Sequence, residues 1–283
     1  MDWLYKKPES REGVFINMEK FPISVCTWSL RKGIGEVCDI LKALGVDGMH
    51  LALGPALAGD AAYLETAKAS GMRISSTMIG FPWENYSTLD TIRETGGIAP
   101  DAHWSEALEL FKRAAPMTAA LGAPYISFHA GFIDHSNPAY AGKFYERMRA
   151  IGDIAADNGI DVLMETGQET GDDLHRFLEE LGHEHVFLNL DPANLILYNK
   201  DTPLNALPKL APWVRHVHAK DAVHTQPGTW GVEVPWGEGE VNVFAFMKAL
   251  DELGCHVPVA VEREAGNDRV GDIAKAVRRL RAY

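Results

Sequence analysis

The chain alternates short apolar runs with helix-like segments, and this alternation repeats eight times between Pro22 and Tyr283. Short apolar runs bounded by glycine and polar residues predict strands, whereas longer segments with apolar residues at helical spacing predict helices. Strands that alternate with helices form parallel sheets, because a parallel connection needs a crossover long enough to hold a helix. Eight such units in 283 residues predict closure into a (β/α)8 TIM barrel.

The predicted strands and helices leave little of the chain unassigned. The predicted strands cover residues 22–28, 46–53, 72–79, 124–129, 161–165, 186–191, 214–220 and 257–262. The predicted helices cover residues 36–44, 60–70, 104–121, 139–158, 171–181, 202–211, 242–253 and 270–281. Since no linker-like or low-complexity segment divides the chain, residues 21–283 are predicted to form a single barrel domain behind a polar N-terminal arm, residues 1–20.

Composition and charge narrow the classes of partner. The formal net charge of −12 argues against a nucleic acid partner, which needs a basic face, but a small phosphorylated substrate needs only a local cation or helix N-terminus. The chain has no membrane-length apolar run, and residues 1–20 lack the apolar core of a secretion signal, so no membrane partner and a cytoplasmic location are expected. Three scattered cysteines (Cys26, Cys38 and Cys255) cannot build a disulfide framework.

Four polar residues stand at the ends of predicted strands five to eight: Glu165, Asp191, His218 and Glu262. The carboxyl ends of barrel strands converge on one rim, and that rim carries the chemistry of barrel enzymes. Side chains alternate along a strand, so Glu262 faces the barrel interior if Val259 and Val261 face the helices. The other three fall on the interior side by the same parity. Three carboxylates and an imidazole would repel one another at this rim unless a divalent cation lay between them.

The predicted ligands do not select one metal firmly. Mixed carboxylate and imidazole donors favour Mn²⁺, Mg²⁺, Co²⁺ or Zn²⁺, and Mn²⁺ is the first choice because oxygen donors dominate. His216 competes with His218 as the imidazole ligand. We favour His218, which lies nearer the rim, and place His216 in a supporting layer.

Candidate substrate contacts surround the predicted metal site. Two long loops, residues 80–103 and 222–241, leave strand carboxyl ends and carry aromatic residues that would either wall a pocket or pack the loops against the barrel. Each polar candidate could instead have a structural role: a histidine can be buried in the barrel interior, an amide can cap a turn and a lysine can form an ion pair. Lys220, for example, is followed by a possible ion-pair partner, Asp221. The candidates are Trp28, Trp83, His129, Gln168, Asn194, Lys220 and Trp230.

Five motifs together resemble the sugar phosphate isomerase/epimerase family. These xylose-isomerase-like barrels include ketose 3-epimerases, hydroxypyruvate isomerases and inosose dehydratases. The resemblance implies that the four strand-end residues hold a divalent ion, that Glu165 and Glu262 also move a proton, that the substrate is a small carbohydrate, and that the protein is a homo-oligomer, a dimer or tetramer. The motifs are Met164-Glu-Thr-Gly-Gln168, Leu190-Asp-Pro-Ala-Asn-Leu195, His216-Val-His-Ala-Lys-Asp221, Gly237-Glu-Gly-Glu-Val241 and Val261-Glu-Arg-Glu264.

Three positions depart from the ketose 3-epimerase pattern. Asn194 stands where those enzymes carry a substrate-binding histidine, Gly171 replaces a second glutamate, and His224 replaces an arginine. The metal ligands are therefore kept while the substrate contacts change. A modified sugar, a keto-sugar or an inositol derivative fits this pattern as well as a free ketose.

These features favour a divalent-metal-dependent isomerase or epimerase that transfers a proton through a metal-stabilised enediolate. The alternative is a lyase, a dehydratase or glycoside eliminase, in which His129 or His224 protonates the leaving group. A DNA-repair endonuclease of the same barrel type is disfavoured by the acidic balance. A non-catalytic sugar-binding barrel is disfavoured because both proton-carrying glutamates are present.

Overall fold

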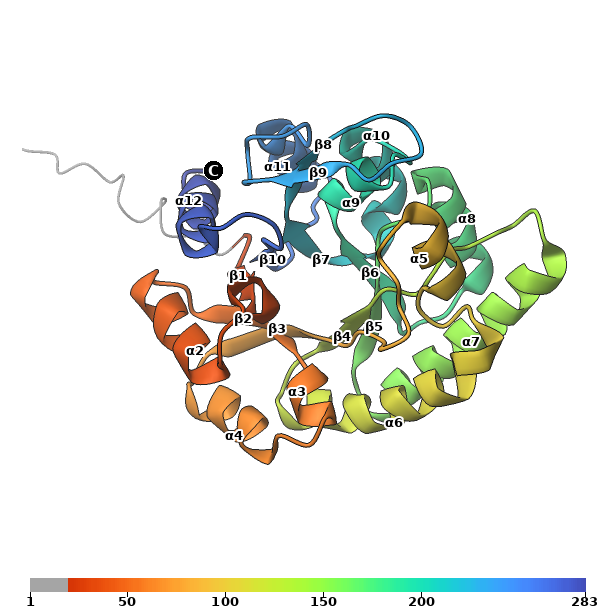
Figure 1. Ribbon diagram of the computed structural model, residues 1–283, viewed down its shortest axis with the longest axis horizontal. Coiled ribbons are helices and arrows are strands. Elements are labelled where there is room, and N and C mark those ends of the chain that lie inside the picture. The colour runs from red at the N-terminus through yellow and green to blue at the C-terminus, as the bar shows by residue number, and fades with distance from the viewer. Residues whose placement is uncertain (1–19) are drawn as a thin grey trace, which may run out of the picture.

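Eight parallel strands close into a barrel in the computed structural model of the protein, which describes residues 20–283 (Figure 1). Around the barrel each strand pairs with its neighbours in chain order, and β10 closes the ring against β1. The prediction of a single (β/α)8 barrel is confirmed, whereas the predicted arm, residues 1–20, lies almost wholly outside the described residues. The barrel strands are β1 (Ile23–Cys26), β2 (Gly48–Ala52), β3 (Arg73–Met78), β4 (Tyr125–Phe128), β5 (Asp161–Glu165), β6 (Val186–Leu190), β7 (Val214–Ala219) and β10 (Val259–Val261).

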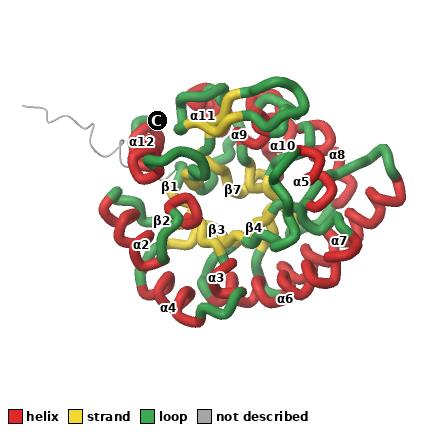
Figure 2. The backbone as a smooth tube through the Cα atoms, viewed as in Figure 1, coloured by secondary structure: helices red, strands yellow, loops and turns green. Residues whose placement is uncertain are grey.

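Eight helices form the outer ring, and each matches a predicted helix to within two residues at either end (Figure 2). Local sequence explains these ends. Thr170 accepts a hydrogen bond from Asp173 N at the start of α8, and Gly182, at φ +57°, ends the same helix. The helices are α2 (Ile34–Ala43), α4 (Ala61–Ala69), α6 (Trp104–Ala120), α7 (Pro138–Asp157), α8 (Gly171–Leu181), α10 (Pro203–Leu210), α11 (Val243–Glu252) and α12 (Arg269–Arg281).

Short elements that the sequence pattern does not predict follow several of the strands or connect helices. They are η1 (Thr27–Leu30), α3 (Gly54–Leu57), α5 (Leu89–Thr95), η2 (Asp101–His103), α9 (Pro192–Leu197), η3 (Ala211–Trp213) and the hairpin β8 (Asp221–Val223) with β9 (Val232–Val234). Elements this short carry too few residues for a recognisable period. The first strand is accordingly shorter than predicted: it ends at Cys26, and Trp28 lies in η1.

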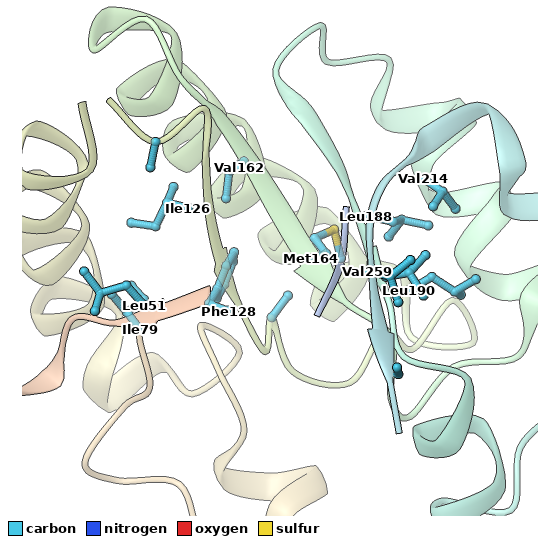
Figure 3. Close-up of a cluster of buried hydrophobic side chains, with 14 of the residues drawn as sticks. Leu51, Ile79, Ile126, Phe128, Val162, Met164, Leu188, Leu190, Val214 and Val259 are labelled. Atoms are coloured by element: carbon cyan, nitrogen blue, oxygen red, sulfur yellow. The ribbon is translucent and has the colours of Figure 1, made fainter. Parts of the chain in front are cut away.

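The strands bury apolar side chains on the outside of the barrel and polar ones within it. Figure 3 shows the outward residues of β4, β5 and β6, among them Phe128, Met164 and Leu188, which pack beneath the helices. The interior carries serine, asparagine and histidine side chains that bond to one another across the barrel: Ser75 with His216, and Ser127 with His50. No helix within residues 20–283 is long and apolar enough to cross a membrane.

Replacing Phe177 of α8 with alanine tests the helix-to-helix packing of the outer ring. Phe177 is fully buried, with ring centroids 5.4 Å from Phe144 and 4.6 Å from Tyr145 of α7. Phe177→Ala should lower the free energy of unfolding by about 3–5 kcal/mol in urea denaturation, because it removes buried area and leaves a cavity. The matched control, Phe244→Ala on α11, removes a ring that is 70% exposed and should change stability by less than about 0.5 kcal/mol. Equal losses in the two variants would contradict this packing.

Candidate metal centre

Four buried side chains meet at the carboxyl end of the barrel: Glu165 at the end of β5, Asp191 after β6, His218 in β7 and Glu262 after β10. One donor atom from each lies within 4.8 Å of the others. His218 Nδ1 is central, at 3.0 Å from Glu165 Oε1, 3.7 Å from Asp191 Oδ2 and 3.3 Å from Glu262 Oε2. The structure therefore brings together all four residues that the strand-end pattern selects.

Each of the three carboxylates presents one buried oxygen that lacks a well-aligned hydrogen bond, although the Lys220 ammonium lies 2.9 Å from that of Glu262. These oxygens are Glu165 Oε2, Asp191 Oδ2 and Glu262 Oε2. A buried carboxylate oxygen without a donor is costly, and three of them facing a common point repel one another as well. A divalent cation with oxygen and imidazole ligands would satisfy all three at once, so this donor set fits the predicted metal.

The second oxygen of each carboxylate is held by the protein. Asp191 Oδ1 caps α9 by accepting hydrogen bonds from Ala193 N at 2.8 Å and Asn194 N at 3.1 Å. Trp28 Nε1 donates to Glu262 Oε1 at 2.7 Å. Asn194 Nδ2 donates to Glu165 Oε1 at 3.4 Å. Each carboxylate is thus fixed through one oxygen and free to bind a cation through the other.

Lys220 supplies positive charge at the edge of this cluster. Its ammonium is buried, 2.9 Å from Glu262 Oε2, 3.7 Å from Asp191 Oδ2 and 2.8 Å from Glu264 Oε2. Burial lowers the pKa of Lys220, but these carboxylates outweigh it and raise that pKa well above its usual value. Burial also raises the pKa of Asp191 to about 6, against the opposing effect of Lys220.

Lys220 does not pair with Asp221, the alternative that the sequence left open. Asp221 instead accepts four backbone hydrogen bonds at 2.9–3.1 Å, and these hold the ends of the loop between β8 and α11. The donors are Ala222 N, Gly237 N, Gly239 N and Val241 N. A Cβ at Gly239 would lie 2.3 Å from Asp221 Oδ1, so only glycine fits there.

A pocket opens beside Glu165, with His129 in its wall. His129 Nε2 lies 3.4 Å from Glu165 Oε2. Burial lowers the pKa of His129, but Glu165 and Glu84 raise it more, and burial raises the pKa of Glu169 to about 7. The pocket therefore holds groups that can exchange protons near neutral pH. Its lining includes Glu84, Tyr86, His129, Glu165, Gln168, Glu169 and Tyr198.

The predicted substrate contacts have different environments in the structure. His129 and Gln168 line the pocket. Asn194 is buried and donates through Nδ2 to Thr166 O at 3.0 Å, and it also lies 3.4 Å from Glu165 Oε1. Trp28 holds Glu262, and Lys220 forms the ion pairs described above.

The tryptophans of the two long loops do not line this pocket. Trp83 stacks between Phe81 and His103 and donates to Gly97 O at 3.1 Å, so it packs its loop against the barrel. The Trp230 ring packs edge to face against Tyr198, with ring centroids 4.6 Å apart, and is not part of the pocket lining. Aromatic loop residues fill structural roles as readily as binding roles, and sequence alone does not separate the two.

The predicted set lacks four polar pocket residues: Glu84, Tyr86, Glu169 and Tyr198. Glu84 also fastens its loop by accepting hydrogen bonds from Phe81 N and Gly97 N. Glu169 follows Glu165 by four residues in the same strand-end loop, and that proximity was the available signal. Tyr198 ends α9, a helix that the pattern did not predict.

A layer of buried side chains lies beneath the metal cluster. Cys26 Sγ is 3.6 Å from His218 Nε2, and His50 Nδ1 is 3.0 Å from the same nitrogen. Burial raises the pKa of the Cys26 thiol to about 12 and lowers that of His50 to about 3, so both are neutral. His216 lies in this layer and bonds to Asn189 Oδ1 at 2.9 Å rather than to a carboxylate.

Comparison with known proteins agrees with the barrel fold. The family model described as xylose isomerase-like TIM barrel matches residues 38–283. A xylose isomerase domain protein from Planctomyces limnophilus has a similar structure, with a TM-score of 0.84 and 30% identity over 93% of this chain and 96% of that chain. A xylose isomerase-like TIM barrel protein from Mycobacterium smegmatis, solved in complex with magnesium, shares the fold with a TM-score of 0.72 and 20% identity, over 93% of this chain and 96% of that one.

Among curated proteins, an inosose dehydratase from Geobacillus thermodenitrificans is 28% identical over 134 residues. This match covers 41% of the present chain and 45% of the dehydratase, so it spans less than half of that relative's length.

Changing Asp191 to asparagine tests whether its free oxygen is a metal ligand. The amide keeps an acceptor for the α9 cap but removes the negative charge. Asp191→Asn should therefore weaken Mn²⁺ binding by more than about tenfold in isothermal calorimetry, with little change in metal-free thermal stability. Asp153→Asn, whose side chain is 75% exposed on α7, is the matched control and should bind as the parent does. Parent-like binding by Asp191→Asn would exclude Asp191 as a ligand.

Removing the Asp221 carboxylate tests its role as a loop anchor. Asp221→Ala leaves four backbone amides without their acceptor, so hydrogen exchange at Gly237, Gly239 and Val241 should accelerate by at least about tenfold. Glu238→Gln changes a carboxylate of the same loop that pairs with the Arg279 side chain at 3.4 Å, and it should leave exchange unaltered. Slow exchange retained in Asp221→Ala would show that the loop is held by other contacts.

Proposed function

The chain belongs to the xylose isomerase-like TIM barrel family of enzymes, and from this premise we propose that it is a divalent-metal-dependent isomerase or epimerase of a sugar, keto-sugar or sugar phosphate. The observation that carries the proposal is the pair of buried glutamates, Glu165 and Glu262, on either side of His218 Nδ1. Each presents an unbonded oxygen to the same small space. Two carboxylates in this arrangement can act as base and acid toward a single substrate carbon.

In the proposed reaction, Glu165 and Glu262 transfer the proton, and all four ligands bind the cation. A divalent cation held by Glu165, Asp191, His218 and Glu262 would polarise a substrate carbonyl and make the adjacent C–H acidic. One glutamate then removes that proton, and the other returns it from the opposite side to give the epimer. Return of the proton to the neighbouring carbon gives the aldose–ketose isomer instead. Trp28 holds Glu262 and Asn194 holds Glu165, each by a hydrogen bond to one carboxylate oxygen.

The surrounding groups bind and orient the substrate. His129 and Gln168 can bond to sugar hydroxyls, while Tyr86 and Tyr198 limit the access of water. Lys220 keeps Glu262 in its charged form. We propose Mn²⁺ as the metal because three of the four donors are carboxylate oxygens. A cytoplasmic location and a dimeric or tetrameric assembly remain part of the proposal, the first from the sequence and the second from the family resemblance.

A lyase is the second candidate, favoured by the acids in the pocket. His129 and Glu169 both have raised pKa values, and either could protonate a leaving hydroxyl or glycosyl oxygen. His224, the other acid considered from the sequence, pairs with Glu240 on the exposed loop and is less suited to this role. The curated relative named an inosose dehydratase supports this alternative. The product separates the two functions, because a lyase yields an unsaturated or dehydrated compound.

A solvent-exchange assay tests the proposed proton transfer. The Mn²⁺-loaded protein is incubated in D₂O with a panel of ketoses, 3-keto-glycosides and keto-inositols, and the carbon beside the carbonyl is followed by proton NMR. Deuterium should enter that carbon, and Glu165→Gln or Glu262→Gln should slow its entry by at least about 100-fold, since each change removes a base and a ligand. His224→Gln serves as the control and should exchange like the parent.

Dialysis against a chelator should abolish this exchange, and added Mn²⁺ or Co²⁺ should restore it. Full exchange in a demonstrably metal-free sample would refute the metal requirement. Turnover with complete retention of substrate hydrogen would indicate hydride transfer between carbons instead of proton transfer.

A further inference from the structure

The His218 ring has two nitrogens with different surroundings. Nδ1 faces the three carboxylates, and Nε2 faces the barrel interior, 3.0 Å from His50 Nδ1. If His218 binds a cation, as the proposed function requires, Nδ1 must be free of its proton. A neutral imidazole carries a single N–H, so that proton must then lie on Nε2. A fully buried N–H needs an acceptor, because no water reaches it.

The surroundings of His50 decide whether it can be that acceptor. His50 Nε2 lies 2.8 Å from Ser127 Oγ, and Ser127 donates its hydroxyl proton to Thr77 O at 2.9 Å. A carbonyl oxygen only accepts, so the Ser127 proton points toward Thr77 and the Ser127 oxygen is left to accept from His50 Nε2–H. His50 Nδ1 then has no proton and presents its lone pair to His218 Nε2.

We propose that His50 is a positioning residue for His218. By accepting the His218 Nε2–H, His50 keeps Nδ1 unprotonated and aimed at the carboxylates. Three hydrogen bonds run in series from His218 to His50, from His50 to Ser127 and from Ser127 to Thr77 O. Because the Thr77 carbonyl can only accept, it determines which group is the donor in each of them. His50, Ser127 and His218 are all 0% exposed, so no solvent exchanges with these bonds.

Asn189 cannot set the tautomer in the same way. Its Nδ2 lies 3.0 Å from His218 Nε2 and its Oδ1 lies 2.9 Å from His216 Nδ1. This orientation suits the opposite tautomer, in which His218 Nδ1–H donates to Glu165 Oε1. An amide can turn over and exchange its nitrogen and oxygen, so Asn189 adapts to either tautomer. His50, bound to a fixed carbonyl through Ser127, favours only the metal-binding one.

The tautomer of His50 is the first test, and it does not depend on metal binding. Long-range proton–nitrogen NMR spectra of the ¹⁵N-histidine-labelled protein distinguish the two ring nitrogens. His50 should carry its proton on Nε2, both in the metal-free protein and with Mg²⁺. A proton on His50 Nδ1 in the metal-free protein would overturn the inference.

The second test compares two substitutions of His50 by calorimetry with Mn²⁺. His50→Phe keeps an aromatic ring but has no acceptor, and it should weaken Mn²⁺ binding by about 10-fold or more. His50→Gln can accept from His218 and donate to Ser127, so it should stay within about threefold of the parent. Parent-like binding by a folded His50→Phe variant would overturn the inference, as would equal losses in both variants.

Ser127→Ala provides a test that keeps the His50 ring in place. Without the serine oxygen, the direction of the His50 bonds is no longer fixed, and a detectable fraction of the Nδ1–H tautomer should appear in the same NMR spectra. An unchanged His50 tautomer in Ser127→Ala would contradict the role given to Ser127 and Thr77. If the parent protein binds no Mn²⁺, the proposed function is wrong. The role of His50 is tested separately by its tautomer in the metal-free protein.

Discussion

The site is governed by the repulsion among three carboxylates buried within reach of a single ion. Glu165, Asp191 and Glu262 have almost no access to water, and each leaves one oxygen without a well-aligned hydrogen bond. Such a cluster is tolerable only if positive charge is placed beside it. Lys220 and His129 supply part of that charge, and a divalent cation would supply the rest. The hydrogen bonds from neighbouring residues keep the three carboxylates in place despite their mutual repulsion.

The barrel strands place polar side chains in the barrel interior, where they can hold the buried site. Its apolar side chains lie outside, beneath the helices (Figure 3). Its interior carries serine, asparagine and histidine residues that bond to one another. These bonds fix the orientation of side chains that an apolar interior would leave unsatisfied. The polar layer below His218 therefore connects the fold to the chemistry, because it determines which ring nitrogen faces the carboxylates.

In the loops after the strands, carboxylates that accept hydrogen bonds from backbone amides fix both a predicted ligand and the loops themselves. Asp191 caps α9 with one oxygen and faces the cluster with the other, so the start of a helix fixes a predicted ligand. Asp221 anchors the loop from β8 to α11, and Glu84 anchors the loop that carries α5. Asp221 and Glu84 each bond through a single carboxylate to at least one backbone amide that is 13 or more residues away. Local spacing gives no sign of such bonds, which is why Asp221 was considered only as a partner for Lys220.

The order of strands and helices and the inward parity of Glu165, Asp191, His218 and Glu262 can both be predicted from the sequence. Both follow from short-range rules, since a strand alternates its side chains every two residues and a helix repeats its apolar face every three or four. Other features emerge only in the folded barrel: Trp83 packs its loop, Trp28 holds Glu262, Glu169 lines the pocket and His50 lies against His218. These contacts join residues from different strands and loops, and their partners are selected by barrel closure and packing rather than by any period along the chain.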